Sequence, residues 1–486
     1  MKSVLSVLAL GLAVSVAGCA AIDPGAATQS LLSGPQLGLQ EGDIAWPDAK
    51  WWERYGDTQL NQLMEEALRG SPSLAIAQAR LDMANASARS ARAVRLPQLN
   101  AGYQHTRQRF SENYIYPPPY GGSMLTDASL RLNASFDLDL WGKNRALHMA
   151  ALTRAQASQA DAQAARNALV GAVAQSYFNL QNALAQHEVI GRIVEQLGNV
   201  LDVTRQRVAA GLDTRVEQEQ AASALSSAKV QLSQADTNAE LLRHQLAALL
   251  GAGPERGKTI VRVALGQAPT GVPERLPLSL LGRRPDVVAA RLQAQASASD
   301  VSAAKAAFYP DINLAAFAGF LSLGLDNLLQ GSSRTYGVGP AISLPLFNGG
   351  QLNAKLSGKR AERELAIAQY NQTLLQAVRE VADTTTRIRA LQSERSDQQD
   401  SYRAIASAYE IAVQRYKSGL GNFVQVLLAQ NEVQKQAILN TDLQARAYNL
   451  DAELATVLGG GYQEAEAASA PADAGPSGSA AASLTE

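Results

Sequence analysis

The residue types that most often carry catalysis or bind metals are scarce in this chain and widely separated. The four histidines are His105, His148, His187 and His244, and the only cysteine is Cys19. None of them has the spacing of a metal-binding pair, and no glycine-rich loop that would cradle a phosphate follows a strand-like segment. The sequence therefore predicts a protein that is not an enzyme and that uses neither a metal nor another cofactor.

Cys19 lies where a covalent lipid would be attached. Residues 1–18 carry one lysine and then an apolar run from Val4 to Val16, and Cys19 ends the tetrapeptide V-A-G-C. The run is too short to cross a bilayer as a helix, and small residues follow it, which is typical of a cleaved export signal. The tetrapeptide resembles a bacterial lipobox, whose cysteine becomes lipidated, for example with palmitate. Ala20 rather than Asp follows, which favours the outer membrane; a chance cysteine in an ordinary signal peptide is the alternative.

The overall charge gives no reason to expect a nucleic-acid partner. Lys and Arg total 43 and Asp and Glu total 44 among 486 residues, a formal net charge of −1. No broad basic field would therefore attract phosphates. Residues 462–486 are mostly Ala, Glu, Pro, Ser and Gly, so they offer little to bury, and we expect them to be disordered.

The sequence contains an internal duplication. Pro72 and Pro97 bracket an Ala-rich stretch that leads into a strand-like segment, and Pro285 and Pro310 bracket a similar stretch of the same length. In both copies a second strand-like run, a long helical segment, a glycine turn and another helical segment follow. This order predicts one body with pseudo-twofold symmetry rather than a string of separate domains.

Each copy contains a helical segment that is too long for a compact domain. Residues 359–418 contain neither Gly nor Pro, and a helix from about 350 to 417 would be roughly 100 Å long. The segments 214–250 and 422–458 would return alongside as shorter helices. Because the apolar stripe is narrow and rich in Ala, a single chain cannot bury it, and we expect partner chains. An extended coiled-coil rod is the alternative.

The segment 127–140 alternates like a strand with one apolar and one polar face. Even-numbered positions from Ala128 to Leu140 are apolar, and odd-numbered positions from Asp127 to Asp139 are polar. Such a strand exceeds the ordinary length and is long enough to cross a bilayer. We expect the segment 99–109 to pair with it.

The second copy predicts a weaker strand pair. Residues 312–321 alternate poorly, and Pro340 and Pro345 cannot donate to a ladder. No apolar stretch is long enough for a membrane helix, so a passage through a membrane needs a closed β-barrel. Four strands are too few to close one, since the smallest have about eight, and several chains must contribute. A soluble four-stranded sheet under the helices is the alternative.

Six blocks of residues occur in the order of a known family. They are W-W-E-R-Y-G-D-T-Q-L (51–60), L-G-R-R-P-D-V-V-A-A-R (281–291), A-A-K-A-A-F-Y-P-D-I-N-L (303–314), L-P-L-F-N-G-G (344–350), R-Y-K-S-G-L-G-N-F-V-Q-V-L-L-A-Q (415–430) and L-G-G-G-Y (458–462). Together they resemble the lipoprotein branch of the TolC-like outer membrane factors, the NodT/OprM type. The resemblance runs from about residue 20 to 462.

The resemblance implies an α+β, mainly helical fold in a homotrimer. Three chains of four strands would form a 12-stranded transmembrane β-barrel, continuous with a long periplasmic α-helical barrel and a mixed equatorial domain. The expected segments are a signal peptide (1–18), a lipidated and equatorial segment (19–71), repeat 1 (72–253, with a strand pair at about 98–140 and a helical hairpin at about 143–250), an inter-repeat equatorial segment (254–284), repeat 2 (285–461, with a strand pair at about 311–347 and a helical hairpin at about 350–458) and the disordered tail (462–486).

The resemblance also assigns the two glycine turns to a periplasmic tip, where helices coil inward to close the duct. Gly211 and Gly419 would allow the tight reversals that a β-carbon hinders. Arg415 and Tyr416 come one turn before the second reversal and would make the polar links that hold such a gate shut. A solvated Arg and a packed Tyr are the alternative.

Leu428 departs from the family pattern. Related channels often carry an acidic residue just before the Ala-Gln of this motif, which gives an acidic ring in the trimer. Leu428, with Val424 one turn earlier, instead predicts an apolar constriction that closes by dewetting. Asp213 or Glu217, near the first turn, would supply only a substitute for the acidic ring.

The resemblance implies a passive exit duct of the outer membrane that extends into the periplasm and docks on a periplasmic adaptor and an inner-membrane transporter. Lipid-anchored members usually serve small-molecule efflux, so we expect amphiphilic or toxic compounds as cargo. One alternative is a channel for type I protein secretion. The other is a periplasmic coiled-coil structural or adaptor lipoprotein that forms no channel, although an adaptor normally has one helical hairpin and this chain has two.

Overall fold

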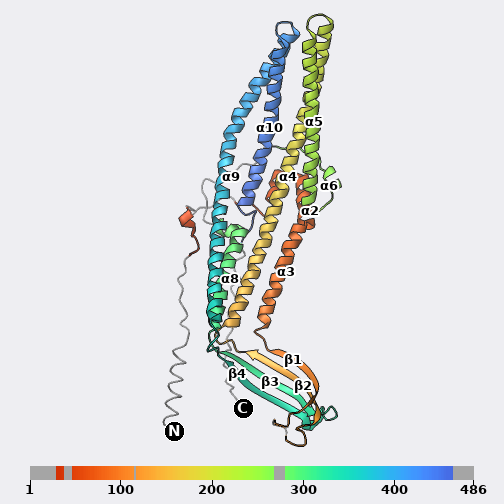
Figure 1. Cartoon of the computed structure of the whole chain (residues 1–486). Helices are drawn as coiled ribbons and strands as arrows, with labels where there is room; N and C mark the ends of the chain where they lie inside the picture. The colour runs from red at the N-terminus through yellow and green to blue at the C-terminus, as the bar shows by residue number, and fades with distance from the viewer. Residues whose placement is uncertain (1–28, 38–45, 114–116, 267–279, 464–486) are drawn as a thin grey trace, which may run out of the picture. The chain divides into compact units, whose positions relative to one another are not determined.

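The computed structural model describes residues 29–37, 46–113, 117–266 and 280–463 (Figure 1). The predicted signal peptide, Cys19 and nearly all of the predicted tail lie outside these residues. The chain forms two compact units, the first from Met1–Leu37, Ser71–Arg166 and Ala289–Arg379, and the second from Gly38–Gly70, Asn167–Val288 and Glu380–Glu486. Each unit therefore takes segments from both copies of the duplication.

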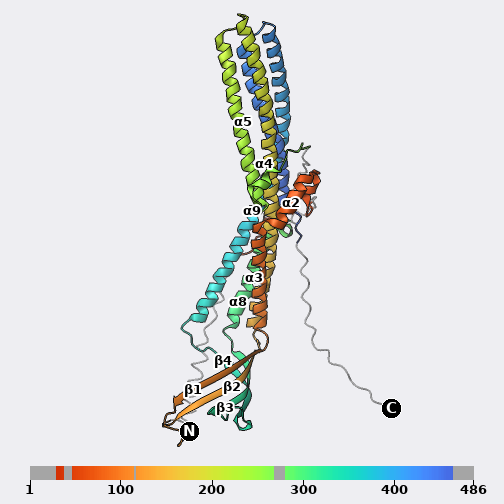
Figure 2. The ribbon, with the colours of Figure 1, turned by 90° about the vertical axis from the view of Figure 1, so that its right-hand side faces the viewer.

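The first unit contains one antiparallel sheet of four strands (Figures 1 and 2). The strands are β1 (Gln98–Arg109), β2 (Met124–Asp137), β3 (Asp311–Leu323) and β4 (Arg334–Ser343), in the order β1-β2-β3-β4. Helix α3 (Pro72–Ala93) precedes β1, and α8 (Pro285–Ala306) precedes β3. The two strand pairs come from the two copies and meet where β2 pairs with β3.

The sheet has two faces, and they differ most in chemistry on β1 and β2. Residues opposite each other in neighbouring strands share a face, and the register places Arg131 between Gly102 and Gly319. We call this side the polar face; on β1 and β2 it carries Gln98, Asn100, Gly102, Gln104, Thr106, Gln108, Leu125, Asp127, Ser129, Arg131, Asn133, Ser135 and Asp137. The opposite, apolar face carries among others Leu99, Tyr103, Leu130, Leu132, Phe136, Leu314, Phe320, Tyr336, Val338 and Ile342.

The second strand pair, which the sequence predicts less strongly, is a continuous ladder. β3 alternates poorly because its polar-face positions include Phe317 and Leu321. Pro340 lies opposite Leu314 on β4, the outer strand of this chain's sheet. Pro345 follows the end of β4.

The predicted strand 127–140 starts earlier and ends earlier than its alternation suggests. β2 ends at Asp137 because Asp139 has a positive φ of 44°. The Asp139 carboxylate accepts hydrogen bonds from the backbone amides of Asn144 (2.8 Å) and Arg145 (2.7 Å) at the start of the next helix. The alternation of polar and apolar residues continues beyond the end of the strand because Asp139, a polar residue, caps the next helix.

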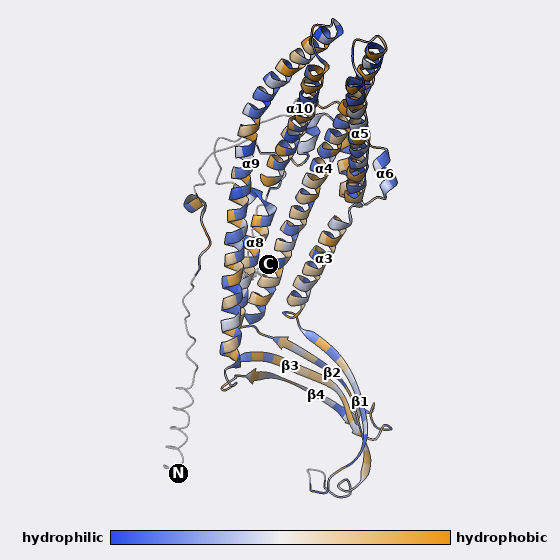
Figure 3. Ribbon diagram, turned by 45° about the horizontal axis from the view of Figure 1, so that its top comes forward, coloured by the Kyte–Doolittle hydropathy of each residue, from blue (hydrophilic) through white to orange (hydrophobic). Residues whose placement is uncertain are grey.

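Four long helices repeat in matched lengths. α4 (Lys143–Ala209) and α9 (Gln351–Lys417) have 67 residues each, and α5 (Arg215–Leu249) and α10 (Phe423–Val457) have 35 each. At about 1.5 Å per residue the longer pair measures roughly 100 Å. None of the helices among the described residues combines the length and the apolar character that a bilayer crossing requires. Figure 3 shows polar and apolar residues mixed along all of them.

Shorter elements complete the chain. They are η1 (Gly34–Leu37), η2 (Trp51–Tyr55), α2 (Thr58–Gly70), α6 (Pro254–Lys258), α7 (Leu280–Arg283) and η3 (Gly331–Ser333). In the second unit, η2 is fixed to α10 through Asp451, which is only 3% exposed. Its carboxylate accepts hydrogen bonds from the Arg54 guanidinium (2.5 Å) and the Tyr55 hydroxyl (2.6 Å). The W-W-E-R-Y block therefore anchors η2 against α10.

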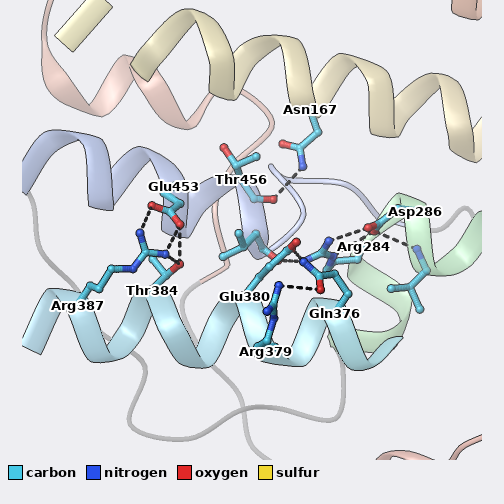
Figure 4. A network of polar contacts seen from close by, with 12 residues as sticks. Asn167, Arg284, Asp286, Gln376, Arg379, Glu380, Thr384, Arg387, Glu453 and Thr456 are labelled. Carbon is cyan, nitrogen blue, oxygen red and sulfur yellow. Dashed lines mark hydrogen bonds and ion pairs between the residues drawn. The ribbon is translucent and has the colours of Figure 1, made fainter. Parts of the chain in front are cut away.

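Arg284, from the L-G-R-R-P-D block, joins α8 to α9 and α10 within the second unit (Figure 4). Its guanidinium donates to Asp286 (2.6 and 3.0 Å), to Glu380 (2.8 Å) and to the Val457 carbonyl (3.3 Å). The Arg284 side chain is 10% exposed, whereas Asp286 and Glu380 are about a third exposed. One buried cation therefore neutralises two carboxylates and binds a helix end.

Arg284→Ala removes this shared cation, and we expect a loss of about 2–4 kcal/mol of stability, because partly buried carboxylates then lose their counter-charge. The apparent melting temperature of the detergent-solubilised protein should fall by several degrees. Arg403→Ala is the matched control: Arg403 pairs with Asp400 at 3.1 Å, but both are well exposed, so the change should be small. Equal effects of the two variants would contradict the assignment.

Candidate functional site

The two helical hairpins of the second unit reverse through turns of the same construction. Gly211 and Gly419 have φ values of +71° and +74°, which L-residues rarely adopt. In both turns the amide after the glycine bonds back to a carbonyl five residues earlier, and the glycine amide bonds to a carbonyl three residues earlier. These bonds are Leu212 to Arg207 (2.9 Å), Gly211 to Val208 (3.0 Å), Leu420 to Arg415 (2.8 Å) and Gly419 to Tyr416 (3.0 Å). This pattern is the Schellman motif.

Each returning helix begins with a side-chain cap. The Thr214 hydroxyl accepts from the Val216 amide (3.2 Å), and the Glu217 carboxylate accepts from the Thr214 amide (2.9 Å), which forms a capping box. A hydrogen bond from the Thr214 hydroxyl, together with hydrogen bonds from backbone amides, lowers the pKa of Glu217. In the second copy, the Asn422 side chain accepts from the Gln425 amide at 3.0 Å. Glu217 therefore caps a helix.

Asp213 connects the two hairpins. Its carboxylate accepts two hydrogen bonds from the Arg207 guanidinium, at 2.8 and 3.3 Å, and one from the Tyr416 hydroxyl of the other hairpin. The Arg207 Cζ atom lies 4.6 Å from the centroid of the Tyr416 ring, a cation–π contact. The Asp213 and Arg207 side chains are 11% and 17% exposed, so the pair is shielded from water.

The protonation of this group follows from its contacts. Hydrogen bonds from Arg207, and then from Tyr416, lower the pKa of Asp213 below its ordinary value of 3.8. Burial, together with the hydrogen bond to Asp213, raises the pKa of the Tyr416 hydroxyl. At neutral pH Asp213 is therefore an anion and Tyr416 a neutral donor.

An apolar cluster packs around Tyr416, whose hydroxyl donates to Asp213. Tyr416, on α9, is 4% exposed and packs with residues of the three other long helices, namely Leu201 of α4, Ala221 of α5, and Phe423 and Val426 of α10. The Tyr416 and Phe423 ring centroids are 5.6 Å apart. The ends of the two hairpins are thus held together by one buried polar contact and the packing around it.

The other predicted tip residues lie on the surface of this chain. Leu428 is 66% exposed and Val424 is 50% exposed, one turn apart on α10. The Arg415 guanidinium donates only within its own turn, to the Leu420 carbonyl at 3.4 Å. Within the described part of this chain, the polar contact between the two hairpins involves Arg207, the counterpart of Arg415 in the first copy. The role of Arg207 could have been inferred from the sequence, because both arginines stand four residues before a turn glycine.

The comparisons with known proteins agree in assigning this chain to one family. The model of the family described as "Outer membrane efflux protein" matches residues 63–252 and 276–460. The chain belongs to the outer membrane efflux protein family. Its resemblance to the TolC-like outer membrane factors is thereby confirmed, and this efflux protein is located in the outer membrane and extends into the periplasm.

Individual members of the family match most of the chain. The multidrug resistance outer membrane protein MdtP of Escherichia coli O6:H1 is 34% identical over 472 residues, which are 94% of this chain and 96% of MdtP. The fusaric acid resistance protein FusA of Burkholderia cepacia is 36% identical over 74% of this chain and 70% of its own length. The crystal structure of the outer membrane protein VceC of Vibrio cholerae superimposes with a TM-score of 0.82 at 37% identity, over 86% of this chain and all of VceC.

The lowered pKa of Asp213 predicts the pH range in which its contacts with Arg207 and Tyr416 should be lost. A carboxylate with a depressed folded pKa contributes full stability above its unfolded pKa, about 3.8 here, and loses it as the pH falls through the folded value. Hydrogen exchange of peptides covering 201–212, which exclude the helix start capped by Glu217, should, after correction for intrinsic rates, show equal protection at pH 7 and pH 5 and a loss well below pH 4. Asp213→Asn should lack this acid step. Loss of protection between pH 7 and pH 5 would refute the assignment.

Proposed function

We propose that this efflux protein is the exit duct of a tripartite efflux system, passively conducting small amphiphilic or toxic compounds across the outer membrane. The names of MdtP and FusA associate those relatives with multidrug and fusaric acid resistance, which supports the same role here. Catalysis is not part of this proposal. The transporter that supplies energy would be a separate inner-membrane protein.

The observation that carries the proposal is the two-faced sheet. Its apolar face presents Leu132, Tyr336 and Val338, which are 44%, 83% and 75% exposed, and its polar face presents amides, hydroxyls and carboxylates along β1 and β2. Such a wall separates hydrocarbon from water. The apolar face would meet lipid, and the polar face would line the passage.

The sheet edges support a homotrimer. β1 pairs only with β2 and β4 only with β3 among the described strands, so one edge of each outer strand remains for another chain. Unpaired backbone groups are not tolerated in hydrocarbon. Three copies would join these edges into a 12-stranded barrel, within the size range of outer membrane barrels. Lipidation at Cys19, outside the described residues, would add an anchor to the outer membrane.

A groove of the second unit supports docking of a periplasmic adaptor. Side chains from α4, α5 and α10 surround a cavity of about 510 Å³, lined largely by Gln186, Gln231, Gln234, Asn238, Asn431 and Gln434. Amide side chains both donate and accept hydrogen bonds, so they would suit the polar stripe of a helix laid into the groove. We infer that an adaptor hairpin binds here and brings the transporter to the duct.

The tip would be the gate. Asp213, Arg207 and Tyr416 would hold the hairpins in the closed position, and Val424 and Leu428, exposed on one chain, would meet their copies around the trimer axis. An apolar constriction excludes water and ions when it is narrow. Gly211 and Gly419 would allow the tight turns at which the helices move.

The cargo prediction is tested by deleting the protein in its host. Susceptibility to a panel of amphiphilic compounds should rise several-fold, and accumulation of a fluorescent efflux dye should increase, because the exit step is lost. The wild-type gene should restore both, and so should Arg403→Ala, a surface variant. Unchanged susceptibility and unchanged dye accumulation would contradict small-molecule efflux; impaired secretion of a protein would point to the type I alternative.

The gate prediction uses two variants of the polar contact that keep side-chain size and one double variant of the apolar constriction. Tyr416→Phe and Asp213→Asn each remove a hydrogen bond to a charged group, worth about 1.5–3 kcal/mol, so the open fraction in planar bilayers should rise about tenfold or more. Leu428→Ser together with Val424→Ser should raise conductance by hydrating the constriction. Asp202→Asn is the control, because Asp202 is 69% exposed and pairs only locally with Arg205. If all variants conduct like this control, the gate lies elsewhere.

A further inference from the structure

One cation lies on the polar face of the sheet. Arg131 occupies the middle of β2, and the four strands place no other Lys or Arg on this face. The register assigns Arg107, Arg109 and Arg334 to the apolar face, toward the loop ends of their strands. The acidic residues of the polar face are Asp127, toward the loops, and Asp137 and Asp311, toward the helices.

The neighbouring strands leave room around the Arg131 side chain. Arg131 stands in register between Gly102 and Gly319, so neither neighbour places a side chain beside it. At Gly319 a β-carbon would lie 2.8 Å from the Arg131 Cα atom and 2.1 Å from the Leu130 carbonyl oxygen. Position 319 must therefore be glycine because β2 and β3 approach closely there, and with glycine on both sides no side chain stands directly beside Arg131.

The Arg131 guanidinium has no ionic partner in the described part of the chain. Its Cζ atom lies 5.6 Å from the centroid of the Phe317 ring, which holds it by a cation–π contact. Its Nε atom is shielded from solvent and has no hydrogen-bond partner among the described residues. Asp127 is four residues along the same strand, about 13 Å away at the usual rise. The charge is therefore positioned but not paired.

A planar guanidinium presents its N–H groups in a fixed fork that matches the two oxygens of a carboxylate. We propose that Arg131 is a docking point for anionic groups, carboxylates above all, on compounds that move along the polar face. The proposal rests on the proposed function, in which this face lines the passage. In a trimer, three Arg131 guanidinium groups would lie at the same height in the passage, with Asp127 on the loop side and Asp137 and Asp311 on the helix side. Anions would then meet a positive charge midway along a wall whose other charged groups are acidic.

The test measures the electrostatic potential near Arg131 with charged thiol reagents added from the outer side of the membrane. Ser129→Cys places a thiol two positions from Arg131 on the polar face, about 7 Å away, within the range of weak screening. Its rates of modification by anionic sulfonatoethyl and cationic trimethylammonioethyl methanethiosulfonate are compared with Arg131 intact, with Arg131→Gln and with Arg131→Lys, in the full-length protein in outer membranes. Benzoate serves as the competing carboxylate.

We expect the ratio of anionic to cationic rates to fall about threefold to tenfold in Arg131→Gln and to change less than about twofold in Arg131→Lys, because lysine keeps the charge. Benzoate should slow the anionic reagent only where residue 131 is cationic. An unchanged ratio in Arg131→Gln, or no effect of benzoate, would overturn the docking point.

Leu132→Cys separates this inference from the proposed function. Leu132 lies on the apolar face, so its thiol should react with neither charged reagent if that face meets lipid. A reactive Leu132→Cys together with an unreactive Ser129→Cys would overturn the proposed orientation of the sheet. A reactive Ser129→Cys without a charge effect would overturn only the role of Arg131.

Discussion

The constraint on which the architecture depends is the pair of open edges on a four-stranded sheet. β1 and β4 each pair on one side only among the described strands, and a membrane leaves no water to satisfy the other side. In the proposed trimer, further copies of the chain would satisfy these edges. The duplication follows the same logic, because each copy supplies one strand pair and one helical hairpin, and the helices of the two copies have matched lengths.

At the ends of the hairpins, the two copies differ in a way that suits the proposed gate. Both turns share the glycine, the Schellman bonds and a capped returning helix, but Asp213 stands where the second copy has Gly421. A β-carbon at Gly421 would lie 3.2 Å from the Arg415 Cβ atom, so a larger residue fits poorly there. The first copy therefore provides the carboxylate, and the second provides the Tyr416 hydroxyl that donates to it.

Most of the fold could be predicted from the sequence, because uninterrupted helical segments, paired prolines and strict alternation are local signals. The boundary of β2 could not, since Asp139 satisfies a strand pattern while capping a helix. Nor could the second strand pair be predicted firmly, because Phe317 covers Gly337 and interrupts the polar pattern of β3. At the candidate site, Tyr416 and Asp213 were both predicted as tip residues and Arg207 was not. The contact that joins the three depends on which hairpin faces which, and residue spacing alone does not contain that information.

The central claim is that this chain is one part of a closed tube made of three copies. Native mass spectrometry of the protein extracted from outer membranes in detergent, together with gel mobility with and without heating, tests it most directly. The account predicts a trimer that resists SDS at room temperature and dissociates on boiling into chains near 51 kDa, less the leader. A monomer, or recovery of the protein from the soluble periplasm, would contradict it.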